Sequence, residues 1–270
     1  MRKSGILMHI SSLPSEFGIG KLGDSAYMFA NFLRDCGVQV WQILPLSPTS
    51  YGDSPYQSFS VHAGNPYFID FQRLEKQGFE VTLLDVHADG LVSAQQVADA
   101  IRDDTCLVTI MFANNEIGTI QPIREIGAVC KEKGVLFHTD AVQAAGHVKI
   151  DVNEMNIDML SLSAHKFHGP KGVGMLYARR GIILTNLIEG GAQERGKRGG
   201  TENVPGIAAM AAALTEACAN MDENTKKVTA LRDKLIDGIS KIPHCALNGA
   251  WEPRLPGNVN SVSYTHLRAH

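Results

Sequence analysis

The sequence has few cysteines, little net charge and no long apolar run, and each of these shortages excludes a class of protein. The five cysteines are odd in number, scattered and without metal-type spacing, so we expect neither a disulfide framework nor a zinc module. A formal net charge of −3 argues against a general nucleic-acid binder. No apolar run reaches the roughly eighteen residues of a membrane span, since the longest candidate, 204–219, contains Glu216. The opening apolar run is too short for a secretory signal, so we expect a cytoplasmic protein.

From about residue 79 onward, apolar runs alternate with stretches of helical periodicity, which is typical of βαβ units around a mostly parallel sheet. The predicted strands are 79–86, 106–113, 135–142, 157–164 and 173–179, and the predicted helices between them are 93–102 and 122–134, the second ending at Gly134. Two long helices follow at roughly 203–219 and 222–241. The first is nearly apolar, so we expect it to be buried, whereas the second has the charged face of a surface helix.

The first 75 residues are organised differently. A strand at 5–10, a helix at 24–37 and a strand at 38–46 precede a polar loop at 47–66 that has no element of its own. A loop of this length is usually functional or disordered. Its aromatic side chains, among them Tyr51 and Tyr56, favour binding over disorder.

Polar side chains gather where three consecutive predicted strands end. In an open parallel sheet, ligands bind beyond the carboxyl ends of the strands. Each residue alone has an ordinary structural interpretation: Asn114 and Asn115 as a turn, Asp140 as a helix cap, and His165 as a histidine with its bonds satisfied. Three strand ends together indicate a ligand site. Its candidate residues are Asn115, Asp140, Gln143, Ser163, His165 and Lys166.

Pyridoxal phosphate requires an amine, a carboxylate and phosphate-binding donors in one place. Its aldehyde forms a Schiff base with a lysine, and its ring nitrogen needs a carboxylate to stay protonated. Its phosphate needs hydroxyl, imidazole and backbone donors. Lys166 would supply the amine and Asp140 the carboxylate, while Ser163 and His165 would contact the phosphate.

Two further features surround this set. Asn115 and Gln143 are placed to bond the phenolic oxygen of the ring. The loop 189–203 carries five glycines together with Arg195, Lys197 and Arg198. Glycines let the backbone approach a ligand closely, and the cations favour an anion. A solvated flexible loop is the alternative interpretation.

At these residues the sequence resembles the cysteine desulfurases, fold-type I enzymes that use pyridoxal phosphate. The resemblance covers about 78–263, and its motifs are FANNEIGTIQPI at 112–123, FHTDAVQAAGHVKIDV at 137–152, SLSAHKFHGPKGVG at 161–174 and GGAQERGKRGGTENV at 190–204. It implies the conversion of L-cysteine to L-alanine, with the sulfur transferred to an enzyme cysteine for iron–sulfur or thio-cofactor assembly. It also implies a sulfur-acceptor scaffold protein as a partner.

The resemblance carries roles over to single residues of this chain. It makes Lys166 the Schiff-base lysine and Asp140 the partner of the ring nitrogen. Thr201 would reach the phosphate of a neighbouring subunit, which implies a homodimer. The remaining expected cofactor contacts are Asn115, Gln143, Ser163 and His165.

The sequence also departs from the family pattern. The glycine-rich phosphate turn and the ring-stacking histidine should precede residue 78 and are not there. The loop with the nucleophilic cysteine should follow residue 263, and none of the five cysteines lies in such a context. The last residues, 264–270, match nothing in the family. We therefore expect a truncated, inactive desulfurase followed by a spurious tail.

The first part resembles a second family. Residues 2–70 are similar to the start of an amylomaltase, a 4-α-glucanotransferase of glycoside hydrolase family 77, where this stretch opens a (β/α)₈ barrel. Tyr51 and Tyr56 are the candidate glucan contacts, with turn or packing roles as the alternative. The carboxylates of glycosyl transfer belong to later strands of that barrel.

The expected fold is therefore of the α/β class: a partial fold-type I transferase domain, mostly parallel with helices on both faces, preceded by the first βαβ unit of a barrel. The expected divisions are an amylomaltase-like fragment at 1–76, a desulfurase-like domain at 77–263 and the tail at 264–270. No linker separates the first two, which indicates a chimera of two genes. A glucanotransferase fragment and a chain without any activity are the alternatives to the desulfurase.

Overall fold

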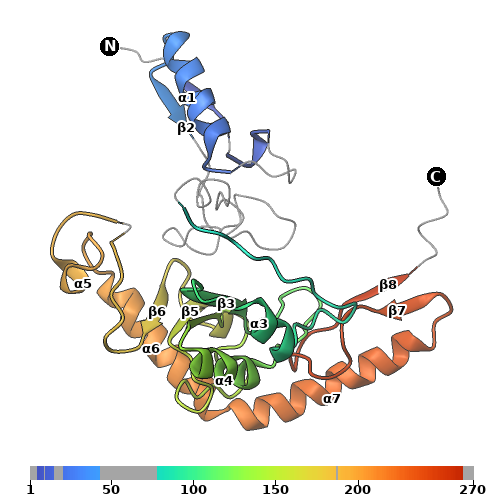
Figure 1. The fold of residues 1–270 in the computed structure, drawn as a ribbon. Coiled ribbons are helices and arrows are strands. Elements are labelled where there is room, and N and C mark those ends of the chain that lie inside the picture. Colours follow the sequence, from blue (N-terminus) through green and yellow to red (C-terminus); the bar gives the residue numbers. More distant parts are fainter. Residues whose placement is uncertain (1–4, 9, 15–20, 43–77, 187, 264–270) are drawn as a thin grey trace. The chain divides into compact units, whose positions relative to one another are not determined.

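The structure, a computed structural model, describes residues 5–8, 10–14, 21–42, 78–186 and 188–263 (Figure 1). Within the chain, two compact units are distinguished. The first comprises Met1–Leu83 with Lys171–Val173, and the second comprises Leu84–Pro170 with Gly174–His270. Tyr51, Tyr56 and the rest of the polar loop that was predicted to bind a ligand lie outside the described residues.

The first unit contains the predicted strand–helix–strand pattern. Strands β1 (Gly5–Leu7) and β2 (Val40–Gln42) pair in parallel, and helix α1 (Asp24–Asp35) connects them after the short 3₁₀ turn η1 (Ile10–Ser12). Trp41 lies edge-on to Phe29 at 5.0 Å between ring centroids and donates from Nε1 to the carbonyl of Met8 at 2.8 Å. This is a βαβ unit with its own small apolar cluster, as the sequence predicts.

The second unit is built on a four-stranded sheet of β3 (Leu107–Met111), β4 (Leu136–Asp140), β5 (Met159–Ser163) and β6 (Gly174–Ala178), in that order. The first three strands are parallel, and β6 runs antiparallel to β5. The prediction of a mostly parallel sheet is confirmed.

Two helices in the first half of this unit begin and end where local sequence signals place them. Ser93 caps α3 (Ala94–Ala100) in a capping box with Gln96, which satisfies two backbone donors at the helix start. Helix α4 (Ile123–Lys133) ends at Gly134, which takes a left-handed conformation (φ 70°) that suits glycine. Helix α4 packs against β4, where Phe137 is completely buried.

The chain then passes through η4 (Ala164–Phe167) and α5 (Gln193–Gly196) to the two predicted long helices, α6 (Val204–Ala219) and α7 (Met221–Ser240). Figure 1 shows α7 running from the end of α6 to an antiparallel hairpin of β7 (Cys245–Leu247) and β8 (Ser261–Ser263). No single helix in the described part of the chain is long and apolar enough to cross a membrane; α6 and α7 pass that test only as a pair, bent by 69°.

Two sequence-based expectations are wrong. Residues 79–86 are not a strand, because none of the sheets formed by the described residues includes them, and a strand needs a neighbour for its backbone hydrogen bonds. Helix α6 is not buried: only Gly206 and Met210 are, and Val204 is 66% exposed. The composition of α6 is apolar all round, but among the described elements it packs mainly against η4 and α7, which leaves most of its side chains exposed.

Candidate functional site

The three parallel strands end at one edge of the sheet, and the predicted site residues follow those ends. Met111, Asp140 and Ser161 stand in register across β3, β4 and β5. A residue a few positions further along each strand therefore emerges at the same edge. Asn115 follows β3, Gln143 follows β4, and β5 ends at Ser163 and continues directly into η4 with His165 and Lys166.

Lys166 is held on the single turn of η4. The first and last residues of that turn, Ala164 and Phe167, are buried and anchor it in the packed interior. The ring of His147 donates from Nε2 to the carbonyl oxygen of Lys166 at 2.9 Å, which ties the turn to the segment after β4. Burial lowers the pKa of the Lys166 amine. A larger share of this amine is therefore uncharged, and so nucleophilic, than in an ordinary lysine.

Ser163 provides the observation that tests whether a phosphate cofactor fits here. Its hydroxyl oxygen is buried and has no hydrogen-bond partner among the residues that the structure describes. Buried hydroxyls are rarely left without a partner, and such exceptions often mark a ligand or an unseen water. Ser163 lies three residues before Lys166, at the carboxyl end of β5. The residues present therefore fit a ligand that brings an acceptor or donor to this point.

Asp140 lies at the end of β4, and its Oδ1 accepts from the backbone N–H of Val142 at 2.9 Å. Two residues earlier on the same face is His138, whose Nδ1 is 2.7 Å from Thr109 Oγ1 and whose Nε2 is 2.9 Å from Ser161 Oγ. Burial lowers the pKa of His138, and the nearby Asp140 opposes that shift. His138, in its neutral form, thus links β3, β4 and β5 through hydrogen bonds, two residues before Asp140.

His138 and His147 were not among the sequence-based candidates. A signal existed for His138, because a polar residue at a position alternating with Asp140 in an apolar strand points to the same face. No such signal marked His147, since its partner is a backbone carbonyl nineteen residues away.

The two asparagines after β3, Asn114 and Asn115, lie in different environments. Asn114 Oδ1 accepts from the backbone N–H groups of Glu116 and Ile117, both at 2.9 Å, so Asn114 forms the turn after β3. The Asn115 side chain is exposed at that turn. Gln143 is half-buried in the turn that follows β4.

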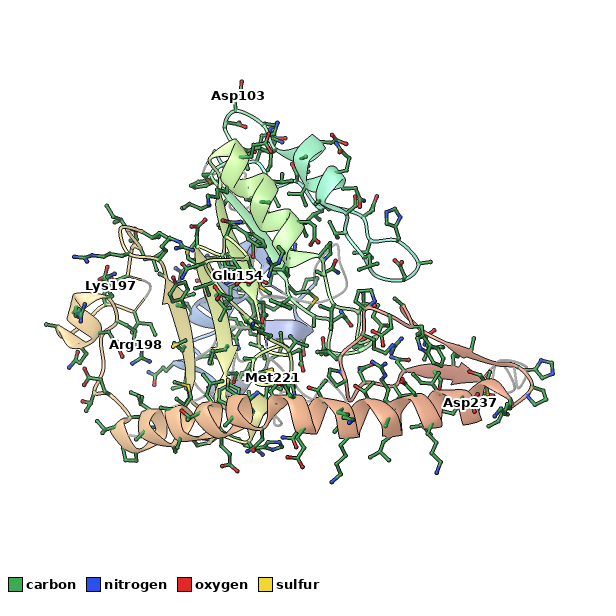
Figure 2. All side chains as sticks on the ribbon, turned by 90° about the horizontal axis from the view of Figure 1, so that it is seen from below. Asp103, Glu154, Lys197, Arg198, Met221 and Asp237 are labelled. Atoms are coloured by element: carbon green, nitrogen blue, oxygen red, sulfur yellow. The ribbon has the colours of Figure 1, made fainter. Side chains whose placement is uncertain are left out.

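The other predicted residues lie in the segment between β6 and α6. Thr201 is exposed in the segment between α5 and α6. Lys197 and Arg198 lie beside α5, at the end of the second unit opposite Asp237 of α7 (Figure 2). Glu194 and Arg195 within α5 have positive φ values of 50° and 58°.

The cysteines are dispersed over the described structure. Cys36, Cys106 and Cys218 are exposed, Cys245 is half-buried on β7, and Cys130 is buried in α4. Burial raises the pKa of Cys130 to about 11. A thiol needs a lowered pKa and access to serve as a nucleophile, so Cys130 is inert.

Comparison with solved structures defines the class of the fold. A NifS-like protein superposes with a TM-score of 0.69 and 39% sequence identity over 72% of this chain and 54% of that one. The mostly parallel sheet with its lysine-bearing turn is thus the fold of the pyridoxal-phosphate-dependent transferases.

The sequence comparisons identify the family. The aminotransferase class-V model matches residues 62–270, and the chain belongs to that family. The cysteine desulfurase IscS of Clostridium botulinum (strain Hall) is 58% identical over 192 residues, which is 70% of this chain and 48% of the relative. The cysteine desulfurase IscS of Methanosarcina thermophila is 58% identical over 194 residues, 72% of this chain and 48% of the relative. The chain spans about half the length of these curated relatives.

A second family model also matches the chain. The 4-alpha-glucanotransferase model covers residues 8–115 and overlaps the first model between 62 and 115. Its match begins directly after β1 and includes α1 and β2.

Proposed function

We propose that residues 77–263 are the cofactor-binding part of a pyridoxal-phosphate-dependent cysteine desulfurase. The observation that carries the proposal is the buried, unpartnered hydroxyl of Ser163, three residues from a lysine whose pKa burial lowers. The curated relatives, which are named cysteine desulfurases, support L-cysteine as the substrate class.

The residues that would hold the cofactor come from three strand ends. Lys166 would bind its aldehyde, and Asp140 its ring nitrogen. Bound there, pyridoxal phosphate would supply an electron sink for the bonds of an amino acid. The other proposed contacts are Asn115 and Gln143 with the phenolic oxygen, Ser163 and His165 with the phosphate, and Thr201 with the phosphate of a partner subunit in a homodimer.

Each of the chain's own groups has a definite task in this proposal. The lowered pKa of Lys166 keeps part of its amine neutral, so that it can attack a carbonyl carbon and later accept a proton. The carboxylate of Asp140 would favour a proton on the ring nitrogen of the cofactor. The hydrogen bond from His147 to the Lys166 carbonyl keeps the lysine-bearing turn in place while its side chain moves.

The proposed reaction also needs a cysteine of the enzyme that accepts the sulfur. In the proposed reaction L-cysteine becomes L-alanine, and its sulfur passes to an enzyme cysteine and then to a scaffold protein. Cys130 is buried with a raised pKa. None of the other four lies at a strand end of the site: Cys36 follows α1, Cys106 precedes the start of β3, and Cys218 and Cys245 lie within α6 and β7. We therefore propose that the 270-residue chain binds the cofactor but does not by itself release alanine from cysteine.

Covalent capture of the cofactor tests this proposal. The purified chain is mixed with pyridoxal phosphate, reduced with borohydride and digested, and the modified lysine is identified by mass spectrometry. We expect visible absorbance and a pyridoxyl label on Lys166, and loss of both in Lys166→Ala. Lys171→Ala, an exposed lysine five residues further on, is the matched control and should behave as wild type. Labelling that spreads equally over surface lysines would refute a specific site.

For the first part of the chain we propose a different origin. The 4-alpha-glucanotransferase match at 8–115 and the parallel β1–α1–β2 unit favour an amylomaltase-like fragment at 1–76. Complete relatives of this fragment would act on α-1,4-glucans. The fragment would be joined as a chimera to the desulfurase part. Sequencing single molecules of source DNA across the codons for residues 60–100 tests this. Halves that never share a molecule are expected for an assembly chimera, whereas one molecule with both halves establishes a true fusion.

A further inference from the structure

The connection between β7 and β8, residues 248–260, is bonded to the turn after β3, residues 114–119, although about 140 residues separate them in sequence. Asn258 Nδ2 donates to the carbonyl oxygens of Asn115 at 3.3 Å and Glu116 at 2.9 Å. Asn260 Nδ2 donates to the same Glu116 carbonyl at 3.2 Å. The turn that carries Asn115 is thus held through its backbone oxygens by two amide side chains. We call residues 248–260 the clamp segment.

A buried arginine sets the direction of the Asn258 amide. Arg254 is 2% exposed, and its Nη1 donates to Asn258 Oδ1 at 2.8 Å. Because a guanidinium can only donate, Oδ1 must face Arg254 and Nδ2 must face the 114–119 turn. Arg254 is itself fixed within the clamp segment, since its Nε donates to the carbonyl of Ala250 at 2.7 Å and its Nη2 to that of Asn248.

Backbone bonds join the two segments as well. Leu255 N–H donates to the carbonyl of Gly118 at 2.8 Å, and Ile120 N–H donates to that of Pro253 at 3.1 Å. Gly118 has φ +75°, and a β-carbon there would overlap the Asn258 side chain. The close approach therefore requires glycine at 118, and no other residue could occupy it without moving the clamp segment.

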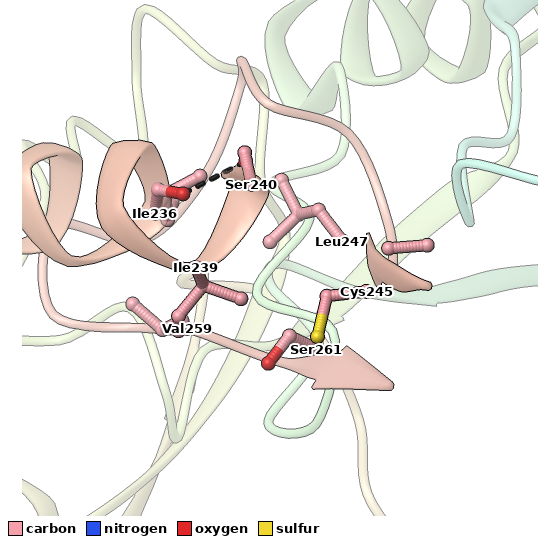
Figure 3. A pocket seen from close by; sticks show the side chains of 8 residues that line it. Ile236, Ile239, Ser240, Cys245, Leu247, Val259 and Ser261 are labelled. Atoms are coloured by element: carbon pink, nitrogen blue, oxygen red, sulfur yellow. Dashed lines mark hydrogen bonds between the residues drawn. The ribbon is translucent and has the colours of Figure 1, made fainter. Parts of the chain in front are cut away.

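The clamp segment is in turn anchored to α7. Ile236 and Ile239 of α7 line a small pocket together with Leu247 of β7 and Val259 (Figure 3). The space left between them is about 10 Å³, room for a single water at most. The Arg232 guanidinium of α7 also donates to the carbonyl of Arg254 at 3.2 Å. The hairpin, α7 and the turn after β3 are therefore linked by direct contacts.

We propose that the clamp segment places Asn115 for its contact with the cofactor ring, with Asn258 as the positioning residue. The role of Asn115 in cofactor binding rests on the proposed function above, whereas the hydrogen bonds between the clamp segment and the 114–119 turn do not. Asn115 is exposed in this turn, and its side chain makes no hydrogen bond to the part of the chain that the structure describes. The bonds from Asn258 to Asn115 and Glu116 hold the two backbone carbonyl groups that follow the Cα atom of Asn115.

The experiment compares Asn258→Asp with Asn224→Asp in the full chain. Aspartate keeps the acceptor that Arg254 uses but cannot donate to the two carbonyls. Asn224 is exposed near the start of α7, where an added negative charge is tolerated. Gly118→Ala is a second variant, which separates the two segments from the opposite side. Three quantities are measured: hydrogen–deuterium exchange of the Ile120 and Leu255 amides, affinity for pyridoxal phosphate, and the pH at which the visible band of the bound cofactor titrates.

In Asn258→Asp we expect about tenfold faster exchange at Ile120 and Leu255 and about tenfold weaker cofactor binding, the loss from one or two hydrogen bonds. The titration of the visible band should move to higher pH, because a loosened Asn115 stabilises the phenolate less. Gly118→Ala should show the same pattern, and Asn224→Asp none of it.

The outcomes separate the two levels of the proposal. Unchanged exchange in both variants overturns the clamp itself. Faster exchange with unchanged affinity and titration overturns the positioning of Asn115 and leaves a purely structural contact. If the wild-type chain captures no pyridoxal phosphate, both the proposed function and the positioning role of Asn258 are wrong. The exchange data then still decide whether the clamp segment holds the 114–119 turn.

Discussion

Replacing Ser163 by alanine should change stability and cofactor affinity in opposite directions. The Ser163 hydroxyl is buried and has no partner among the described residues, so the ligand-free chain bears the desolvation of a polar group without a hydrogen bond in return. Alanine removes the hydroxyl and leaves the rest of the side chain in place. The proposed phosphate contact, however, depends on that hydroxyl.

The expected magnitudes follow from these two roles. An unsatisfied buried hydroxyl costs about 1–3 kcal/mol, so Ser163→Ala should stabilise the ligand-free chain by about 1 kcal/mol or more. That raises the melting temperature by roughly 2–4 °C for a chain of this size. A hydrogen bond to a charged phosphate contributes about 1.5–3 kcal/mol, so cofactor affinity should fall roughly 10- to 100-fold.

The assay is urea unfolding without cofactor, paired with a titration of pyridoxal phosphate followed by visible absorbance. Ser161→Ala on the same strand is the matched control, because the Ser161 hydroxyl is bonded to His138 Nε2 at 2.9 Å and its loss should destabilise the chain. A Ser163→Ala variant that is no more stable than wild type shows that the hydroxyl has a partner, such as water. Unchanged affinity removes Ser163 from the phosphate site.

Three further predictions follow from the geometry of the site. Burial lowers the pKa of Lys166, so below that pKa the charged amine lowers the free energy of unfolding of the folded chain. Lys166→Met should therefore be more stable than wild type at pH 7. The difference in stability should shrink as the pH rises toward the ordinary lysine pKa of 10.5. Urea unfolding across that range measures it, and equal stability at pH 7 would show that burial carries no penalty. With its pKa at about 11, Cys130 is about one-thousandth thiolate at pH 8, so a thiol reagent should label exposed Cys36, Cys106 and Cys218 at least about a hundredfold faster; rapid native-state labelling of Cys130 contradicts its burial. Finally, His147→Ala removes the hydrogen bond to the Lys166 carbonyl, so it should lower stability by about 1 kcal/mol and slow the labelling of Lys166. His147→Gln keeps a donor and should lose less stability. Identical behaviour of the two variants would exclude the hydrogen bond as the cause.

Local features of the fold were predictable wherever the signal and the structure share the same residues. The end of α4 at Gly134 and the start of α3 at Ser93 depend on bonds within a few residues, and both lie where the sequence places them. The segment 79–86 and helix α6 were mispredicted for one shared reason. Apolar composition indicates that a segment can be buried or paired, but what covers it is decided by other parts of the fold.

The candidate site shows the same division. The positions of the strands and the residue types at their ends could be inferred from sequence alone, and parallel strands deliver their carboxyl ends to one edge. This placed Lys166, Asp140, Ser163 and Asn115 at one edge without any coordinates. What each of them can do there could not be inferred in this way.

The sequence by itself determined the parallel sheet, the positions of its strand ends and the chemical types gathered there, because these follow from periodicity and from residue identity. Only the tertiary structure decided that Lys166 is partly desolvated, that the Ser163 hydroxyl has no partner, and that Asn258 holds the turn of Asn115. Those properties depend on burial and on contacts between residues up to about 140 positions apart. Packing in three dimensions creates such contacts, and no local pattern in the chain encodes them.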